Sequence, residues 1–197
     1  MTTLLAFDAS TQNLVVALKK GEKIYSFNQL VPQQHARLIL PTIHALLEQA
    51  QASLADCEAI AFGRGPGSFI GVRIATATAQ GLGYALNKPL IPLSSLQITA
   101  QSVYQRAQSE KIIVSRNAYK GEFYWGMFEL KNGVMKTEQE LLSAPGLLAA
   151  PTEISLYQDE PIQVEAMLQL AAHYFKAGII ANPLAVKPVY LRNEVTG

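Results

Sequence analysis

The segment from Ser68 to Leu86 constrains the fold of this chain more than any other, because it is a helical stretch with almost no charge. Between Gly65 and Asn87 the only charged residue is Arg73. A helix that is apolar all round must be buried on more than one side. At helical spacing two faces are apolar or small, one made of Phe69, Val72, Thr76, Ala79, Gly83 and Leu86, the other of Ile70, Ile74, Ala77, Gly81, Leu82 and Ala85.

Two arrangements would bury such a helix. In the first, one face lies on a sheet and the other is covered by a neighbouring helix and a second polypeptide. In the second, the segment is the central core helix of a well-covered monomer, and the pattern alone favours neither. Charged residues make up 16% of the chain, against roughly 25% in ordinary soluble domains. The chain therefore has little charge to cover its surface, and we expect some apolar surface to meet a partner.

Charge and cysteine content exclude several classes of protein. The net charge of +1 comes without a Lys/Arg run, so the sequence predicts no independent binding of nucleic acid. Cys57 is the single cysteine, which excludes an internal disulfide and a multi-cysteine zinc site. We expect it to be a buried thiol rather than a nucleophile. No signal peptide or segment of about 20 apolar residues is present, so we expect a cytoplasmic protein without a membrane span.

The first half of the chain predicts a mixed sheet with helices on its faces. The expected strands cover residues 4–7, 14–18, 23–30, 58–62 and 90–93, and the expected helices 35–51, 68–86 and 96–107. Three strands joined by short turns open the chain, which is typical of an antiparallel meander. The order of elements indicates an α/β fold.

The second half repeats this theme more weakly. Strands are expected at 111–114, 121–130 and 134–137, with a hairpin turn at Asn132-Gly133. Residues 143–161 have the prolines and glycine of connecting chain, and 164–176 has the pattern of an amphipathic helix capped at Gly178. We expect two lobes, residues 1–104 and a smaller one at 105–197, with the C-terminal tail returning to the first lobe.

The glycine-rich turn 63–71, "GRGPGSFIG", matches neither common phosphate-binding motif. A P-loop needs a lysine after its last glycine, and the next lysine is Lys88. A dinucleotide fingerprint fails because Ser68 or Ile70 stands where the last glycine belongs. A strand leading into a turn and a helix N-terminus can still bind an anion. The alternative is structural, since glycine permits a strained turn and close approach of helix and sheet.

The sequence has no arrangement of residues that is typical of a catalytic site. The carboxylates are scattered, with no pair whose spacing suggests general acid–base catalysis. His35 and His44 are nine residues apart, which is not the spacing of two metal ligands on one helix face. No G-x-S-x-G elbow surrounds a serine. We therefore expect no catalytic residue and no metal ligand.

Asp8 is the one acidic residue in a suggestive place, at the end of the first expected strand. In actin-like ATPase folds a carboxylate there holds magnesium beside the phosphates, and Ser10 and Thr11 would stand where that fold contacts them. The second lobe of such a fold needs a matching acid, and Asn117 occupies that position. Half of a nucleotide clamp is weak support for an ATPase.

Five stretches of the sequence resemble one family. They are "LLAFDAST" with "VVAL", "QHARLILP", "GRGPGSFIGVRIA", "NAYKGEFYW" and the tail "KPVYLRN". On these motifs the chain resembles the TsaB (YeaZ) family of tRNA threonylcarbamoyladenosine biosynthesis proteins. The resemblance covers most of the chain and implies two actin-like (ribonuclease-H-like) lobes, each a mixed sheet with helices, the second shortened here.

The resemblance also implies a function. It implies a non-catalytic subunit that forms a heterodimer with the related catalytic subunit TsaD and a larger assembly with the ATPase TsaE. That complex transfers threonylcarbamoyl to an adenosine beside the anticodon of tRNAs that read ANN codons, so this chain would meet tRNA only indirectly. A homodimer is implied where TsaD is absent. No cofactor of its own is expected, apart from weak ATP or ADP binding at the boundary of the complex. The alternatives are a divergent magnesium-dependent ATPase or phosphotransferase, and an inactive glycoprotease-like homodimer.

The resemblance and the residues together give two candidate sites. The expected partner interface consists of His35, Leu38, Ile39, Thr42, Leu46, Ile70, Arg73, Ile74, Ala77, Gly81 and Leu82. The candidate contacts to a nucleotide phosphate are Asp8, Ser10, Thr11, Arg64, Gly65, Gly67 and Ser68. The family usually has threonine at Ile70, aspartate at Asn117 and serine or threonine at Ala36. The expected connecting chain at 143–161 also replaces a glycine-bearing strand region of the family.

Overall fold

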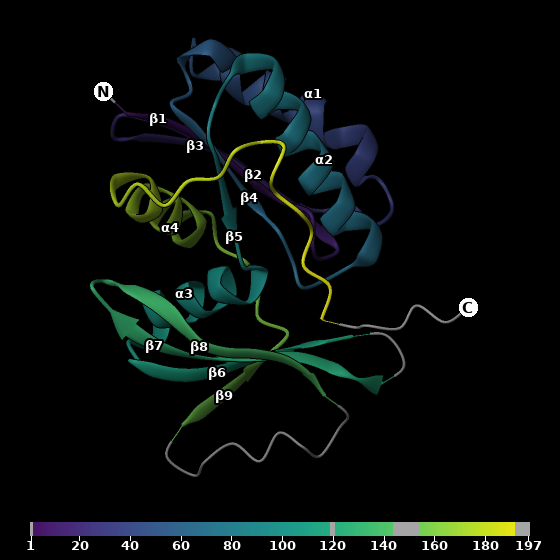
Figure 1. Ribbon diagram of the computed structural model, residues 1–197, viewed down its shortest axis with the longest axis vertical. Helices are drawn as coiled ribbons and strands as arrows, with labels where there is room; N and C mark the ends of the chain where they lie inside the picture. Colours follow the sequence, from purple (N-terminus) through teal and green to yellow (C-terminus); the bar gives the residue numbers. More distant parts are fainter. Residues whose placement is uncertain (1, 119–120, 144–153, 192–197) are drawn as a thin grey trace.

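The protein folds around two β-sheets with a helix between them (Figure 1). The computed structural model describes residues 2–118, 121–143 and 154–191. The predicted α/β class, with two mixed sheets and helices, is confirmed. The predicted boundary between lobes at residue 104 falls inside the helix between the sheets and stays a prediction.

The larger, five-stranded sheet combines an antiparallel meander with a parallel half. Its strands are β1 (Thr3–Asp8), β2 (Asn13–Lys20), β3 (Lys23–Leu30), β4 (Ala59–Gly63) and β5 (Leu90–Leu93), in the order β3-β2-β1-β4-β5. Strands β1, β2 and β3 pair antiparallel, whereas β1, β4 and β5 pair parallel. Parallel strands are covered on both faces, which explains why β1 and β4 are continuous apolar runs.

Alternate side chains of β1 reach two different layers of helices. Leu5 and Phe7 pack in the core under α1 (His35–Gln49) and α2 (Phe69–Leu86), while Leu4 and Ala6 pack under α4 (Val164–Lys176). Figure 1 shows α1 and α2 on one side of this sheet and α4 on the other. A short 3-10 turn, Leu54–Asp56, connects α1 to β4.

The predicted elements of the first half are confirmed with small shifts. The helix expected at 35–51 ends at Gln49 and continues through Pro41. Ser68 is the N-cap of α2, with its hydroxyl accepting a hydrogen bond from the Gly71 amide at 3.3 Å. The remaining helix, α3 (Ser95–Ala107), begins one residue before the predicted start.

The second sheet is larger than the sequence predicted. Its strands are β6 (Lys111–Asn117), β7 (Phe123–Lys131), β8 (Val134–Ser143) and β9 (Ser155–Gln158), in the order β8-β7-β6-β9. The expected hairpin turn is present, with positive φ at Asn132 and Gly133. The expectation of connecting chain over 143–161 is wrong at Ser155–Gln158, which pairs parallel with β6. This short edge strand has mostly exposed side chains and no apolar alternation that would reveal it. Residues 144–153 of that stretch lie outside the described residues.

The chain after α4 runs back along the five-stranded sheet. Ala181 forms a β-bridge with Leu90 of β5, and the Val189 amide donates a hydrogen bond of 2.8 Å to the Arg64 carbonyl. Figure 1 shows this yellow segment passing from α4 to α2. The described tail therefore lies beside the N-terminal half of the chain, and residues beyond 191 lie outside the described residues.

Candidate functional site

The glycine-rich turn brings the start of α2 close to the end of β1. A Cβ on Gly71 would lie 1.8 Å from the carbonyl oxygen of Ala9, and one on Gly63 would lie 1.7 Å from Oδ2 of Asp8. Gly65 has φ of +94°, a conformation that side chains other than glycine rarely adopt. These contacts support the structural reading of the glycines, in which the turn lets α2 pack directly on the sheet.

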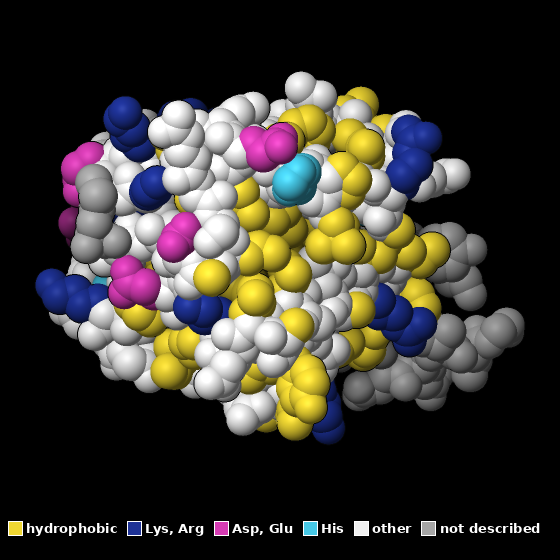
Figure 2. Space-filling view, turned by 90° about the horizontal axis from the view of Figure 1, so that it is seen from above, with side chains coloured by type: hydrophobic (Ala, Val, Ile, Leu, Met, Phe, Trp, Pro, Cys, Tyr) yellow, Lys and Arg dark blue, Asp and Glu magenta, His cyan; other side chains and the backbone are white. Residues whose placement is uncertain are grey.

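The outer face of α2 carries exposed apolar and small side chains. Ile70 is 69% exposed and Tyr84 is 70% exposed. Between them, Ala77 and Gly81 are also exposed, whereas Ala75 and Ala79 on the inner face are buried in the core. Of the two apolar faces recognised in the sequence, one packs on the sheet and much of the other is open. Figure 2 views the molecule from above, the side on which α1 and α2 lie in Figure 1, and hydrophobic side chains gather over the middle of it.

The structure divides the residues expected at a partner interface into three groups. Ile70, Arg73, Ala77 and Gly81 are exposed, and Leu38, Thr42, Ile74 and Leu82 are half-buried. His35, Ile39 and Leu46 are buried in the chain itself. Helical spacing predicted α1, but it does not tell which face of that helix lies on the sheet. Since His35, Ile39 and Leu46 are buried residues of α1 itself, we define the outer α1/α2 face by the exposed and half-buried residues alone.

An aromatic cluster anchors the described tail beside this face. The guanidinium of Arg73 lies 3.7 Å from the centre of the Phe69 ring, and its Nε donates a hydrogen bond of 2.7 Å to the Tyr190 hydroxyl. The Phe69 and Tyr190 rings are 5.6 Å apart between centres. The sequence identified Arg73 but missed Tyr190, because no local pattern reveals a contact between positions 117 residues apart.

The candidate phosphate contacts lie in three different environments. Asp8 and Ser10 are buried beneath the glycine-rich turn, and Thr11 and Ser68 line a hollow of about 510 Å³ between the starts of α1 and α2. Arg64 faces the second sheet, where its charge acts on Glu140. Burial raises the pKa of Glu140, while a hydrogen bond from Ser94 and the charge of Arg64 oppose that rise.

Gly65 and Gly67, the remaining candidate phosphate contacts, pack on other parts of the backbone. A Cβ on Gly65 would lie 3.1 Å from the Val189 carbonyl oxygen, and one on Gly67 would lie 2.5 Å from the Ser10 carbonyl oxygen. Nucleotide contact by any of these residues stays a prediction.

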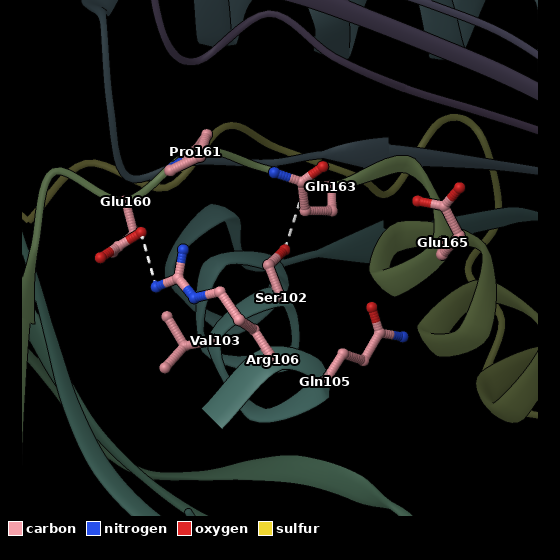
Figure 3. A pocket seen from close by; sticks show the side chains of 8 residues that line it. All are labelled: Ser102, Val103, Gln105, Arg106, Glu160, Pro161, Gln163 and Glu165. Carbon is pink, nitrogen blue, oxygen red and sulfur yellow. Dashed lines mark hydrogen bonds and ion pairs between the residues drawn. The ribbon is translucent and has the colours of Figure 1, made fainter. Parts of the chain in front are cut away.

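Two hollows lie at the joint between the sheets. One, of about 440 Å³, extends from Thr11, between β1 and β2, to Arg116 of β6 and Asp159 after β9. The other, of about 270 Å³, lies between α3 and the segment before α4, with Arg106 and Glu160 forming an ion pair of 3.0 Å across it (Figure 3). No sequence motif pointed to Arg116. It lies beyond the expected strand 111–114, and β6 extends to Asn117 with every residue from Ile112 to Arg116 buried.

Metal and thiol chemistry receives no support from the described residues. Among residues 2–118, 121–143 and 154–191, no three His, Cys, Asp or Glu side chains gather as a metal site would require. Cys57 is fully buried, as predicted, and burial raises the pKa of its thiol to about 11. In the same residues no helix has the length and apolar character to cross a membrane.

Comparisons with known proteins show which family this chain resembles. Residues 27–176 match the family model described as TsaD: tRNA N6-adenosine threonylcarbamoyltransferase. The tRNA threonylcarbamoyladenosine biosynthesis protein TsaB of Haemophilus influenzae is 31% identical over 98% of this chain and 95% of its own length. The protein of the same name from Escherichia coli is 30% identical with the same coverage. The structure of YeaZ from Pseudomonas aeruginosa superposes with a TM-score of 0.91 at 33% identity, covering 97% of this chain and all of that one.

Proposed function

The chain belongs to the TsaB (YeaZ) branch of the TsaD family, among proteins of tRNA threonylcarbamoyladenosine biosynthesis, and from that premise we propose that it is a non-catalytic subunit that binds and activates a TsaD-type catalytic partner. The partner binds on the outer α1/α2 face. In the absence of that partner, the same face pairs with a second copy of the chain. The assembled pair recruits the ATPase TsaE, and this chain meets tRNA only through the complex.

The observation that carries the proposal is the exposed apolar face of α2. Ile70 and Tyr84 are about two-thirds exposed at opposite ends of an 18-residue helix, with small side chains between them. Small residues let a second helix approach closely, and contiguous apolar surface of this kind is unfavourable in water. A helical surface on another protein would bury it. The low charge content of the whole chain agrees with this reading.

The proposal that this chain has no catalytic activity of its own is supported by the surroundings of Asp8 and Cys57. Asp8, the best candidate for an acid that holds magnesium, is fully buried, and both of its carboxylate oxygens already accept hydrogen bonds. Burial of Cys57, with its raised pKa, removes the thiolate that a nucleophile needs. These environments favour a structural role for both groups.

The test is the substitution Ile70→Glu. Its side chain is 69% exposed, so the change leaves the core intact and places a charge within the proposed contact. Ile74 and Leu82 are poorer choices, because both pack partly against the chain's own core. Co-expression with the TsaD-type protein of the same organism, followed by size-exclusion chromatography with light scattering, is expected to give a 1:1 complex for the wild type. We expect the variant to bind at least about 100-fold more weakly, because an unpaired buried charge costs several kcal/mol.

The matched control is Leu156→Glu on β9, where a 42% exposed leucine lies on the other sheet. This variant should keep full binding. The proposal fails if Ile70→Glu co-purifies with the partner as well as the wild type does. If the wild-type chain stays a homodimer and forms no complex with the TsaD-type protein, the result would support the alternative of a separate, homodimeric role.

A further inference from the structure

Arg116 is an arginine that the fold buries between its two sheets. It stands at the end of β6 and is 8% exposed. A buried guanidinium must be paired or hydrogen-bonded, because removing a charge from water is otherwise very costly. Its surroundings therefore indicate what the cation does.

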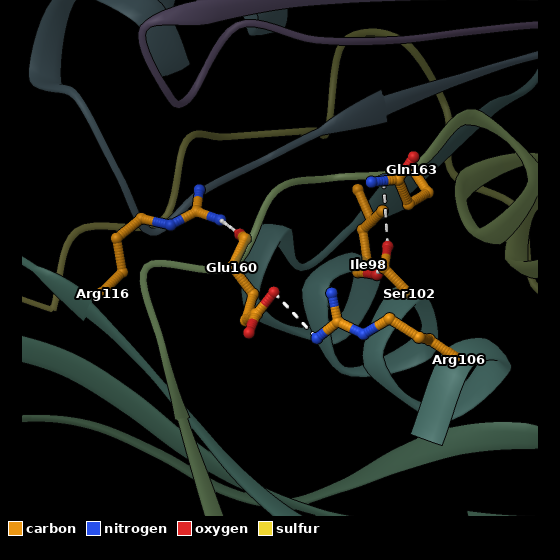
Figure 4. A network of polar contacts seen from close by, with 6 residues as sticks. All are labelled: Ile98, Ser102, Arg106, Arg116, Glu160 and Gln163. Carbon is orange, nitrogen blue, oxygen red and sulfur yellow. Dashed lines mark hydrogen bonds and ion pairs between the residues drawn. The ribbon is translucent and has the colours of Figure 1, made fainter. Parts of the chain in front are cut away.

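The guanidinium contacts three separate parts of the chain. One terminal nitrogen donates to Oγ1 of Thr99 on α3 at 2.8 Å and to the carbonyl oxygen of Glu160 at 3.3 Å. The other donates to Oγ of Ser10, which follows β1, at 3.5 Å. Figure 4 shows Arg116 reaching the Glu160 carbonyl from one side while Arg106 pairs with the Glu160 carboxylate from the other. Arg116 thus ties β6 to the first sheet, to α3 and to the segment that enters α4.

The negative charge that complements Arg116 is Asp8 on the first sheet. Burial lowers the pKa of Arg116, and the charges of Asp8 and Asp159 oppose that effect. The hydroxyl of Ser10 donates to Oδ1 of Asp8 at 2.7 Å while it accepts from Arg116. A chain of hydrogen bonds therefore runs from the acid at the end of β1 to the cation at the end of β6.

This arrangement occupies the place where an actin-like ATPase would hold magnesium. Oδ2 of Asp8 accepts from Ser95 at 2.8 Å, and a Cβ on Gly63 would lie 1.7 Å from the same oxygen. Because Asp8 is fully buried, a metal ion could reach its carboxylate only if the surrounding chain moved. The neighbouring hollow has Arg116 in its wall, together with Asp159 and Glu160, and the carboxylate of Glu160 is already paired with Arg106.

We propose that Arg116 is an internal cation that closes the joint between the two sheets and makes them one rigid body. The inference concerns this chain by itself and does not depend on the identity of its partner. It predicts that the joint needs no ligand to stay closed.

The test is hydrogen–deuterium exchange of the full chain with Arg116→Met, which keeps much of the side chain's length and removes its charge. We expect peptides that cover β6 and residues 159–163 to exchange about ten- to a hundredfold faster, because hydrogen bonds to a buried charge are lost. Peptides of α1 and α2 should keep their wild-type rates. The matched control is Arg106→Met, which removes a half-exposed ion pair to the same Glu160 and should change exchange less than about threefold.

Two further measurements keep the proposal open to refutation. Thr99→Val removes one acceptor with little change of shape, and it should accelerate exchange at the same two peptides by a smaller factor. This variant decides the question if Arg116→Met unfolds completely. Unchanged exchange in both variants, or equal acceleration in α1 and α2, would overturn the proposal. So would protection of β6 and residues 159–163 when magnesium ATP is added to the wild-type chain, because the joint would then have a ligand of its own.

Discussion

The helices α2 and α3 reverse the usual relation between composition and burial. Helix α2 has a single charge in 18 residues, yet Ile70, Ala77 and Tyr84 stand open to water. Helix α3 has a much lower mean hydropathy, yet every residue from Ser95 to Val103 is buried. An apolar exposed helix and a polar buried helix therefore lie in the same small protein.

The two helices differ in which contacts their side chains make within the chain. The buried polar side chains of α3 all have partners within the described residues, and these are Ser95, Gln97, Thr99, Gln101 and Ser102. Their partners come from both sheets and from α4, so the hydrogen bonds of α3 connect these three parts of the chain. The outer face of α2 needs apolar contacts that the described residues do not supply. A buried polar helix thus indicates an internal contact, and an exposed apolar one indicates an external contact.

The strongest way to break this comparison is to remove one polar group from α3. Ser95→Ala leaves Oδ2 of Asp8 without the hydroxyl that donates to it at 2.8 Å, in a fully buried site. We expect the free energy of unfolding to fall by about 2 kcal/mol, within the range for an unsatisfied buried charged group. Urea denaturation followed by circular dichroism measures the loss.

The reverse change on α2 is the control for Ser95→Ala. Ala77→Ser adds a hydroxyl to an exposed position, so water can satisfy it and only helix propensity changes. Its cost should be about 0.5 kcal/mol or less. Equal costs for the two variants would mean that the polar contacts of α3 are not what holds the joint.

The same contrast explains what the sequence predicted and what it did not. The sequence predicted the helix 68–86 that α2 confirms, because helical spacing and the glycine turn are both local. The environment of Asp8 could not be read locally, since its partner Ser95 is 87 positions away. The strand β9 was missed because it pairs through a single neighbour and has no apolar face.

The candidate interface shows a further limit of periodicity. The pattern gave two apolar faces for α2 and a helix at α1, but only packing decides which face of each lies on the sheet. Ile39 and Leu46 were therefore expected at the surface and are core residues. Ile70 was expected there and is exposed. Burial against the chain's own sheet depends on contacts between residues far apart in the sequence. The helical pattern alone therefore does not predict it.

Two glycines of α2 sharpen the comparison between its inner and outer faces. A Cβ on Gly81 would meet nothing within 4 Å, whereas one on Gly83 would lie 2.8 Å from Cδ2 of Leu90 and 3.0 Å from Cγ of Pro183. Gly81→Ala should raise the free energy of unfolding by about 0.5–1 kcal/mol through reduced backbone entropy. Gly83→Ala should lower it by about 1 kcal/mol, because overpacking outweighs that gain. Thermal unfolding of the isolated chain separates the two.

These glycine variants also report on the partner. If the outer α1/α2 face packs closely against another helix, Gly81→Ala should stabilise the isolated chain and yet weaken its complex. Light scattering of the complex and thermal unfolding of the chain would then move in opposite directions. Tighter binding by Gly81→Ala would contradict close packing at this position.

The smallest expected effect tests where α3 meets the second sheet. At the N-cap of α3, Ser94 donates a hydrogen bond to Glu140 of β8, and burial raises the pKa of this carboxyl. A raised pKa means that the folded state holds the proton more tightly, so the protonated acid favours folding and this contribution is lost as the pH rises above the ordinary glutamate value of about 4.3. Glu140→Gln should therefore stabilise the chain modestly at pH 7, with a difference from the wild type that shrinks toward pH 4. Urea denaturation at the two pH values measures this, and a variant less stable than the wild type at pH 7 would mean that the charges of Arg64 and Glu140 hold the joint instead.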